Sequence, residues 1–421
     1  MKLFVSKSAL RGRVLIPASK SHTIRACVIA SLAEGLSQLV APLDSQDTRS
    51  CVRACRALGA EIQMGANWEV RGTGGRLVTP DDVINVGNSG TTLYITLGTA
   101  ALGTGWSVFT GDEQIRRRPV QPLMDGLEQL GVSVYSTRGN GLPPVVVRGK
   151  MRGGACNVDA VSSQFLTSLL INTPLAEGDT EIHVGVLNEA PYVEMTLSWL
   201  DEQGVGYTKE GLKHFQIPGG QRYKAFHKRI PGDFSSATFF LCAGAVADAD
   251  LTLEGLDMGD AQGDKAVVQM LQHMGAQVEV SQDAIRISRG DLVGRTFDLN
   301  NTPDALPSMA VVGCFARGTT RLENVPQARL KETDRIRVMA QELGKMGARI
   351  LELPNGLQIE ESRLKGAKVH GHQDHRVVMA LVVAGLAAEG QTQVDTAEAV
   401  EITFPTFVEL MKGVGARIEA V

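Results

Sequence analysis

Two cations and two hydroxyl residues open a helix near the start of the chain and could together bind an anion. Ser19, Lys20, Ser21 and Arg25 lie at its start, and the following residues Ala26–Ala30 are apolar on every side. A helix that is apolar all round is buried, so only its charged N-terminus can face solvent. Free backbone N–H groups, the positive end of the helix dipole and fixed cations favour a bound phosphate or carboxylate.

The same pattern recurs along the chain, where small, polar or acidic residues lead into runs rich in Ala, Val and Leu. Five further starts lie at Asn88–Thr92, Ser162–Gln164, Asp233–Ser236, Asp304–Pro307 and Asp374–Arg376. Six buried helices are therefore predicted to begin with groups that can contact a ligand. Viewed alone, Asn88–Thr92 is equally well an ordinary capping sequence.

Two charged clusters are also predicted at helix starts. Arg116–Arg118 precedes Pro119, and cations at the positive end of a helix cost up to about 1 kcal/mol, which suggests that a ligand is held there. Lys331–Arg335 is the densest charged cluster of the second half. Each cluster has a simpler interpretation, a solvated patch for the first and an exposed salt-bridged turn for the second.

Three nearby histidines, His370, His372 and His375, suggest a metal site, since alternating side chains on a strand point the same way. No other cluster of Cys or His completes a ligand shell, so no metal is expected. Motifs of serine hydrolases, P-loop proteins and zinc proteases are absent. The helix starts are the one kind of site that the sequence indicates.

The elements that position these starts repeat about every 70 residues, counted between glycines that end amphipathic helices. These glycines are Gly59, Gly131, Gly204, Gly275, Gly347 and Gly415. A short β-branched strand follows each one, so every repeat is predicted as β-α-β-α-β-β with one buried and one half-exposed helix. A chain of 421 residues is too long for one core, and six repeats divide into two domains of three.

Composition excludes several classes of function. Hydrophobic residues make up 43% of the chain, yet no apolar run reaches the roughly 18 residues of a membrane span. The net charge of −4 argues against nucleic acid, because binding a phosphate backbone needs a basic surface. Six cysteines without C-x-x-C spacing, and an N-terminus without an apolar leader, indicate a reduced, cytoplasmic protein.

Taken in order, these motifs resemble the 5-enolpyruvylshikimate-3-phosphate (EPSP) synthase family over essentially the full length. The matching segments are Pro17–Ser21 with Arg25, Gly87–Thr91, Arg117–Pro119, Ser162–Gln164, Asp304, Lys331–Arg335 and Asp374–Arg376. The resemblance implies a two-domain inside-out α/β barrel, with helices inside and sheets outside. One domain would span 18-231 and the second 1-17 plus 232-421, with the active site in the cleft between them.

The implied reaction moves the enolpyruvyl (carboxyvinyl) group of phosphoenolpyruvate to the hydroxyl of shikimate 3-phosphate and releases phosphate. It needs no metal or organic cofactor. The implied partners are these small molecules alone, and we expect a monomer. Bidentate guanidinium contacts would fix the phosphate and carboxylate of the donor.

The resemblance also assigns roles to single residues. Asp304 would be the base at the acceptor hydroxyl, Glu332 the proton donor to the methylene carbon, and Lys20 an assistant to either transfer. The positions matched to phosphoenolpyruvate binding are Lys20, Gly90, Arg118, Gln164, Arg335, His375 and Arg376. Those matched to acceptor binding are Ser21, Arg25, Ser162, Ser163, Gln164, Asp304, Gln327 and Lys331.

Four positions depart from the family pattern. Tyr94 and Ile402 stand in place of an arginine and a lysine, and Gln327 stands where asparagine is common in some members. Glu189 replaces a serine that binds phosphate, and an ionised carboxylate about 4 Å from a phosphate would repel it by on the order of 4 kcal/mol. Either Glu189 points away and another cation compensates, or the acceptor is a non-phosphorylated hydroxylated ring acid.

Parts of the sequence also fit two other functions. A relative acting on a nucleotide sugar is disfavoured, because Gly111–Arg117 lacks the reactive cysteine of that sister family. A non-catalytic binding protein is suggested by Tyr94 and Ile402, but the retained Asp304 and Glu332 argue against it.

Overall fold

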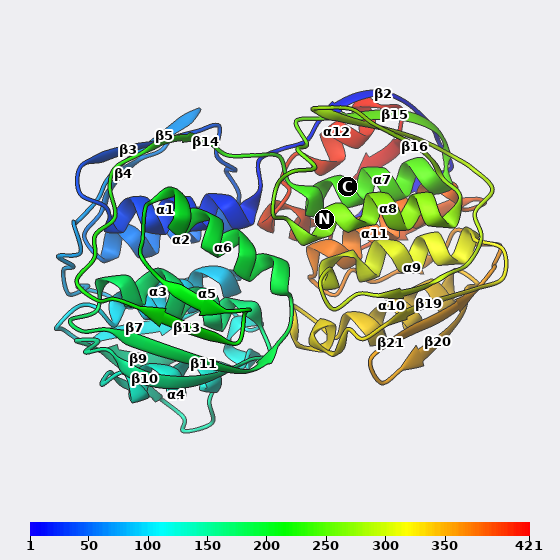
Figure 1. The fold of residues 1–421 in the computed structure, drawn as a ribbon. Coiled ribbons are helices and arrows are strands. Elements are labelled where there is room, and N and C mark those ends of the chain that lie inside the picture. Colours follow the sequence, from blue (N-terminus) through cyan, green and yellow to red (C-terminus); the bar gives the residue numbers. More distant parts are fainter. The chain divides into compact units, whose positions relative to one another are not determined.

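The fold comes from a computed structural model that describes all residues, 1–421. By internal packing the chain divides into two compact units, Ala18–Ile230 and Met1–Pro17 with Pro231–Val421. Each unit contains three four-stranded sheets and three buried helices (Figure 1). No helix is both long and apolar enough to cross a membrane.

One repeat illustrates the strand pairing shared by all six sheets, although the sheets that contain β14 (His227–Arg229), β2 (Ala9–Leu15) and β1 (Leu3–Ser6) take that strand from a distant part of the chain. Strand β10 (Gly154–Ala160) pairs parallel with β11 (Thr180–Leu187), which pairs antiparallel with β13 (His214–Ile217), and β13 pairs antiparallel with β12 (Thr208–Glu210). Helices α5 (Ser163–Asn172) and α6 (Ala190–Glu202) lie between these strands in sequence, which gives the order β-α-β-α-β-β.

The other five sheets, β14-β3-β5-β4, β6-β7-β9-β8, β16-β17-β15-β2, β18-β19-β21-β20 and β22-β23-β1-β24, have the same pairing. In the unit Ala18–Ile230 their strands are β3 (Leu36–Val40), β4 (Glu61–Gln63), β5 (Asn67–Arg71), β6 (Ile84–Asn85), β7 (Ser107–Thr110), β8 (Ser133–Ser136), β9 (Val145–Arg148) and β14 (His227–Arg229). In the other unit they are β1 (Leu3–Ser6), β2 (Ala9–Leu15), β15 (Asp248–Glu254), β16 (Gln277–Val280), β17 (Ala284–Ser288), β18 (Thr296–Asp298), β19 (Thr319–Glu323), β20 (Arg349–Leu353), β21 (Gly356–Glu360), β22 (Lys368–Val369), β23 (Gln391–Val394) and β24 (Arg417–Ala420). The predicted six-repeat α/β fold is confirmed.

The first helix of each repeat forms the centre of its unit. These central helices are α1 (Lys20–Leu32), α3 (Gly90–Ala100) and α5 in one unit, and α7 (Phe234–Val246), α9 (Leu306–Phe315) and α11 (His375–Ala387) in the other. Every residue of α7 and of α3 is buried, and so is every residue of α11 except Ala387. Because no side of these helices is polar, each can be covered on all sides by its neighbours.

The second helix of each repeat is amphipathic and lies outside the central three. These outer helices are α2 (Gln46–Ala57), α4 (Gln121–Gln129), α6, α8 (Ala266–Met274), α10 (Arg335–Lys345) and α12 (Phe407–Gly413). The glycine just beyond each helix has a left-handed backbone, with φ from 68° at Gly204 to 107° at Gly59. An L-side chain is disfavoured there, which is why a glycine recurs at each of these helix ends.

Polar residues cap five of the six central helices. The Ser19, Ser89 and Ser162 side chains accept bonds from the first turns of α1, α3 and α5, and Asp233 and Asp374 do so for α7 and α11. Helix α9 instead continues from the 3-10 turn η4 (Pro303–Ala305). The capping interpretation therefore holds for these residues, and the residues after them are the ones able to meet a ligand.

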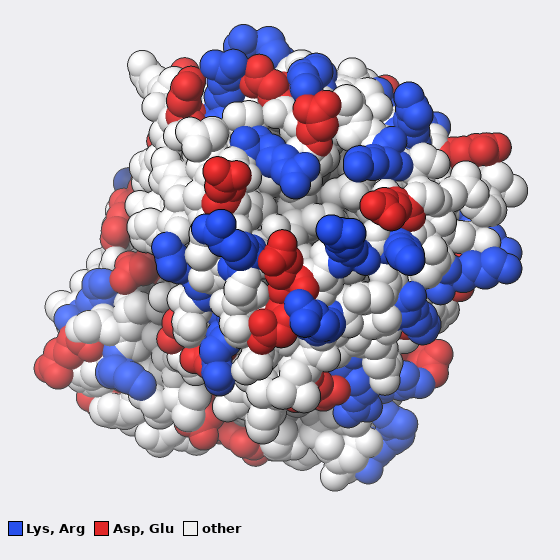
Figure 2. All heavy atoms as spheres, turned by 90° about the vertical axis from the view of Figure 1, so that its right-hand side faces the viewer, with Lys and Arg blue, Asp and Glu red and all other residues white.

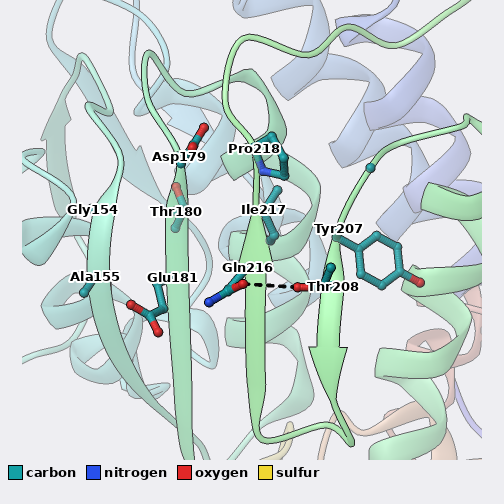
Figure 3. A pocket seen from close by; sticks show the side chains of 11 residues that line it. Gly154, Ala155, Asp179, Thr180, Glu181, Tyr207, Thr208, Gln216, Ile217 and Pro218 are labelled. Carbon is teal, nitrogen blue, oxygen red and sulfur yellow. Dashed lines mark hydrogen bonds between the residues drawn. The ribbon is translucent and has the colours of Figure 1, made fainter.

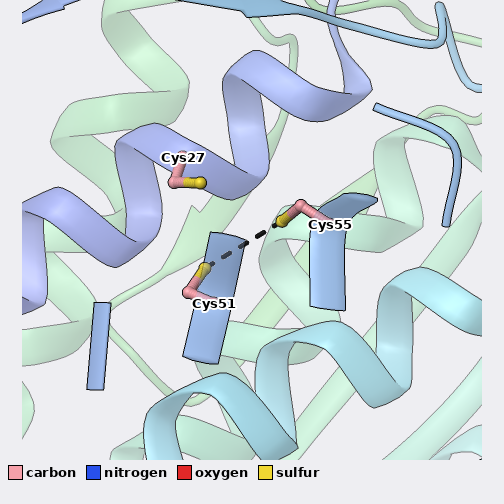
Figure 4. A group of neighbouring side chains, drawn as sticks. All are labelled: Cys27, Cys51 and Cys55. Carbon is pink, nitrogen blue, oxygen red and sulfur yellow. Dashed lines mark hydrogen bonds between the residues drawn. The ribbon is translucent and has the colours of Figure 1, made fainter. Parts of the chain in front are cut away.

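All six cysteines are buried and none forms a disulfide. Cys27 on α1 faces Cys51 and Cys55 on α2, with 3.9 Å between the Cys51 and Cys55 sulfurs (Figure 4). Burial raises the pKa of Cys156 and of Cys314 to about 12. Those two thiols therefore stay protonated at neutral pH, as expected of core residues.

We predict that Gly72→Ala will destabilise the protein by roughly 1–3 kcal/mol or more. A Cβ at Gly72 would lie 2.2 Å from the Ala33 carbonyl oxygen and 2.4 Å from that of Ala30, at the end of α1. Gly344→Ala is the matched control, because a Cβ there meets nothing within 4 Å and alanine is the better helix former by about 1 kcal/mol. Urea unfolding of both variants measures the effect. A Gly72→Ala variant that unfolds at the wild-type midpoint would refute the prediction.

Candidate functional site

The predicted catalytic residues of the second unit meet around one buried arginine. Arg335, the first residue of α10, is 1% exposed. Its Nε lies 2.8 Å from Asp374 Oδ2, its Nη1 2.7 Å from Asp304 Oδ1, and its Nη2 2.5 Å from Glu332 Oε2. Burial opposes the charge of Arg335, but the three carboxylates outweigh it and raise the pKa above its usual range.

A second arginine extends this network. Arg376 Nη2 lies 2.9 Å from Asp304 Oδ2, so the Asp304 carboxylate bridges Arg335 and Arg376. Asp374 binds Arg335 with both oxygens and also accepts a bond from the Arg376 amide, as the N-cap of α11. The ion pair thus fixes the starts of α10 and α11 to each other. His375, beside Arg376, is buried.

Two further predicted residues of this unit lie in and after the 3-10 turn η5 (Pro326–Leu330). Gln327 is buried, and its Nε2 donates to the Asn300 carbonyl at 2.9 Å. Lys331 directly follows the turn and is half-buried, next to Glu332 in the chain.

Asp264 is a buried acid of this network that sequence analysis missed. It lies in the 3-10 turn η3 (Gly263–Lys265), where its Oδ2 accepts a bond from the Ser235 hydroxyl. Burial, together with the nearby charge of Asp304, raises its pKa to about 6, although Arg376 acts in the opposite direction. Burial thus favours the neutral form of this acid more than it does for an exposed aspartate.

In the unit Ala18–Ile230, Lys20 lies at the start of α1 with its Nζ 3.2 Å from Asp47 Oδ2. Asp47 is buried in the first turn of α2 and is a second acid that sequence analysis missed. Asp47 and Asp264 stand at the second helix of their own repeats. The repeat itself was the signal that could have found both.

Gly90 and Arg118 lie directly against each other. A Cβ on Gly90 would be 2.4 Å from Arg118 Nη1, so only glycine allows the guanidinium to lie so close to the first residue of α3. Arg118 is buried, whereas Arg116 and Arg117 in the 3-10 turn η1 (Ile115–Arg117) are exposed. Arg117 pairs with Glu113. The solvated-patch interpretation therefore applies to Arg116 and Arg117, and Arg118 alone turns inward.

Glu189 does not point away from the predicted phosphate-binding residues. Its Oε2 accepts bonds from the Ser163 hydroxyl at 2.8 Å and the Ser163 amide at 3.4 Å. The side chain is buried, and the backbone is left-handed with φ 58°. In this structure a carboxylate occupies the donors expected to hold the acceptor phosphate. Beside them, Ser162 caps α5, and the Gln164 Oε1 atom is buried without a hydrogen-bond partner.

Arg25 is enclosed by protein groups. Its guanidinium donates to Thr196 Oγ1 at 2.9 Å, Thr167 Oγ1 at 3.2 Å and the carbonyls of Tyr192 and Ser21 at 3.0 and 3.1 Å. Burial lowers its pKa to about 10. Arg25 thereby ties α1 to α5 and α6, and it meets Ser21 only through the Ser21 backbone.

Apolar packing accounts for two of the departures from the family pattern. Tyr94 stacks edge-on against Phe165 at 4.9 Å between ring centroids, and its hydroxyl donates to the Pro119 carbonyl at 3.1 Å. Ile402, at the end of the 3-10 turn η6 (Ala397–Ile402), belongs to the hydrophobic core of its unit. Neither position leaves a gap where a cation would stand.

The two histidines before α11 bind carboxylates. His370 Nδ1 lies 2.6 Å from Asp395 Oδ1, and His372 Nε2 lies 3.0 Å from Glu342 Oε1. Burial opposes ionisation of Glu342, but bonds from Lys345, the His370 amide and His372 outweigh it and lower its pKa. These contacts hold the loop that leads into Asp374.

A cavity of about 570 Å³ is lined by none of these residues. It opens on the sheet β10-β11-β13-β12 and is lined by residues such as Asp179, Glu181, Tyr207, Thr208 and Gln216 (Figure 3). It contains none of the predicted catalytic groups. On the face seen in Figure 2, basic and acidic side chains are interspersed, without the basic stripe that nucleic-acid binding requires.

Comparison with known proteins identifies the class first. The fold matches EPSP synthase from Acinetobacter baumannii with a TM-score of 0.83 at 26% identity, covering 100% of both chains. It also matches the enolpyruvyl transferase NikO from Streptomyces tendae with a TM-score of 0.81 at 19% identity, covering 99% and 98%, which concerns the fold alone. The architecture is that of the enolpyruvyl transferases.

The family follows from the sequence. The family model described as EPSP synthase (3-phosphoshikimate 1-carboxyvinyltransferase) matches residues 5–411, and the chain belongs to this family. Proteins named 3-phosphoshikimate 1-carboxyvinyltransferase share 57% identity in Acetivibrio thermocellus, over 99% of both chains, and 52% in Ruminiclostridium cellulolyticum, over 100% of both. One from Methanocaldococcus jannaschii shares 43%, over 99% of both chains. The resemblance inferred from the motifs is confirmed.

We predict a pH-dependent effect of Asp264→Asn on stability. The folded-state pKa of about 6 exceeds the unfolded value of 3.8, so the stabilisation from the bound proton is fully present below about 3.8 and is lost as the pH rises through about 6. The variant stays neutral, so from pH 4 to pH 7 it should gain roughly 2 kcal/mol relative to wild type. Urea unfolding across this range measures the difference, with the exposed Asp291→Asn as control. Parallel curves for Asp264→Asn and wild type would contradict the assignment.

Proposed function

We propose that the helix-start residues of the two units act together on one pair of substrates. The active site would lie in a cleft between domain 18-231 and domain 1-17 plus 232-421. The chain is a carboxyvinyltransferase of the EPSP synthase family, which moves the enolpyruvyl group of phosphoenolpyruvate to the hydroxyl of shikimate 3-phosphate and releases phosphate. The shared network of Asp304, Glu332, Arg335 and Arg376 is the observation that carries this proposal.

Asp304 is the proposed base at the acceptor hydroxyl. Its two oxygens face Arg335 and Arg376, and two neighbouring guanidinium groups favour the ionised form that a base needs. The arginines also hold the carboxylate in a fixed direction, which suits proton removal at one defined atom.

Glu332 is the proposed proton donor to the methylene carbon. Without substrate it contacts Arg335, a partner that favours its charged form. When the carboxylate of phosphoenolpyruvate binds Arg335, that contact weakens and protonation of Glu332 becomes easier. Donor binding would in this way prepare the acid, and Lys20 would assist the proton transfers.

The donor and acceptor contacts follow the matched positions. Lys20, Arg118, Arg335, His375 and Arg376, with the Gly90 amide and Gln164, would bind the phosphate and carboxylate of phosphoenolpyruvate. Preorganised cations at these helix starts would also stabilise the anionic tetrahedral intermediate. The acceptor would lie on Ser21, Arg25, Ser162, Ser163, Gln164, Asp304, Gln327 and Lys331.

A phosphorylated acceptor is supported by the relatives named 3-phosphoshikimate 1-carboxyvinyltransferase. It requires Glu189 to release Ser163 when the acceptor phosphate binds. Acid–base chemistry by side chains suffices for every step, so no cofactor enters the proposal. We also propose that the enzyme is cytoplasmic and monomeric.

We predict that the protein releases phosphate from phosphoenolpyruvate only when shikimate 3-phosphate is present. Glu332→Gln should bind both substrates and lower kcat by at least about 100-fold, because general acid catalysis contributes that much or more. Glu361→Gln, an exposed glutamate outside the network, is the control and should keep the wild-type rate.

Phosphate release is followed by a coupled assay, and substrate binding to the variant by calorimetry. If phosphate is released only with a non-phosphorylated ring acid, that acid is the acceptor in place of shikimate 3-phosphate. If wild type binds both substrates but releases no phosphate, the proposed enzyme activity is refuted. An unchanged kcat in Glu332→Gln would remove that residue from the proton-donor role.

We predict that Glu189→Gln will lower KM for shikimate 3-phosphate at least tenfold and leave KM for phosphoenolpyruvate unchanged. Glutamine keeps the bond to Ser163 but removes a charge whose repulsion of a phosphate at about 4 Å is on the order of 4 kcal/mol before any rearrangement. Glu194→Gln on α6, the helix that Glu189 precedes, is the control, because the Glu194 side chain is 48% exposed and pairs with Lys209. A higher KM in Glu189→Gln would show instead that the carboxylate helps to bind the acceptor.

A further inference from the structure

Two histidines lie side by side on the outer face of the sheet β10-β11-β13-β12. His183 on β11 and His214 on β13 are direct cross-strand partners. Their rings stack with centroids 4.8 Å apart and planes inclined by 20°. Both strands are internal to the sheet, so backbone pairing on each side fixes the distance between the two imidazoles.

One carboxylate faces both rings. Glu181 lies two residues before His183 on β11 and therefore on the same face of the sheet. Its Oε1 atom is 2.7 Å from His214 Nε2 and 3.5 Å from His183 Nε2. Two nitrogens and one oxygen thus converge on one point, and all three donor atoms lie within 4.8 Å of one another.

We propose that Glu181, His183 and His214 bind a divalent zinc ion. Zinc bonds of about 2.0–2.2 Å in tetrahedral geometry place neighbouring donors about 3.3 Å apart, and the two distances from Glu181 bracket this value. Small rotations of the exposed His183 and the half-buried Glu181 and His214 would enclose the ion. Three protein ligands leave the fourth position to water, and the charge of Glu181 offsets part of the charge on the metal.

A second carboxylate completes the arrangement. Glu210 on β12 is the cross-strand partner of His214, and its Oε1 lies 4.0 Å from His214 Nδ1. Histidines that bind a metal through one ring nitrogen commonly donate the other N–H to a carboxylate, which fixes the ring and its tautomer. Glu210 would hold His214 with Nε2 directed at the ion.

The sheet keeps the site in place from below. Ile182, between the two ligands on β11, and its cross-strand partner Phe215, next to His214 on β13, are fully buried in the core. Glu181 also lines the 570 Å³ cavity, where it stands beside Gln216 of the neighbouring strand (Figure 3). The ligands are therefore accessible to solvent, and the backbone that carries them is rigid.

The donor set selects the metal. Two imidazoles and one carboxylate suit zinc and its transition-metal neighbours, whereas Mg²⁺ and Ca²⁺ prefer oxygen ligands. Copper(II) should bind at least as tightly as zinc. The site uses none of the residues proposed for carboxyvinyl transfer, so its test is independent of that function. Bound zinc would link β11 to β13 and stabilise the folded state.

Calorimetric titration of the full chain with ZnCl₂ tests the proposal, with MgCl₂ as the comparison ion. We expect a zinc site that His183→Ala and His214→Ala each weaken at least tenfold. Glu210→Gln should weaken zinc binding by up to about tenfold, the lower end of the loss in metal affinity when a residue that holds a metal ligand is replaced. His227→Ala removes an exposed histidine on β14 and should leave binding unchanged. Binding should weaken at lower pH, since protons compete for the imidazoles.

Thermal unfolding supplies a second readout. Zinc at a hundredfold excess over its Kd should raise the midpoint of wild type and of His227→Ala by several degrees, and should not raise that of the double variant His183→Ala with His214→Ala. Turnover of the double variant without zinc should match wild type. Zinc binding that survives in the double variant would place the ion elsewhere, for example at His370 and His372 or at the three buried thiols, and would overturn the proposal. Equal affinity for Mg²⁺ would overturn it as well.

Discussion

The constraint on which the whole structure depends is that the central helices are apolar on every side. Such a helix gains stability only where neighbours cover it completely, and α7, with all its residues buried, shows how far this goes. Covered helices can offer ligands nothing but their ends. Most of the proposed functional groups therefore lie at or just before helix starts, where backbone N–H groups, capping side chains and a few cations or acids gather.

Burial also explains why the charges at these starts come in networks. A lone guanidinium inside a protein would be strongly destabilising, and Arg335 is tolerated because Asp374, Asp304 and Glu332 surround it. The carboxylates in turn are held by that arginine and by Arg376. Removal of one member would leave its partners buried and uncompensated, so this network positions the acids and stabilises the unit at once.

Much of this could be predicted because the relevant signals are local in sequence. The polar residue before an apolar run and the glycine after an amphipathic helix follow from capping and backbone sterics, and they located all six repeats. Asp47 and Asp264 escaped notice because each acquires its role from a residue on another element of its unit. The pairing of His183 with His214 likewise depends on the register of two strands that lie about 30 residues apart, which no local pattern encodes.

Each departure from the family pattern changes either the packing of the core or the charge near the proposed site. Tyr94 and Ile402 replace expected cations with side chains that fill the core, so the fold tolerates them without strain. Glu189 differs, because it adds a buried negative charge that is bonded to Ser163. With two cations fewer and one carboxylate more, the proposed substrate contacts rest more heavily on Lys20, Arg118 and Arg376. Anion binding here should accordingly depend on the exact placement of those three side chains, which Asp47, Gly90 and Asp304 control through direct contact.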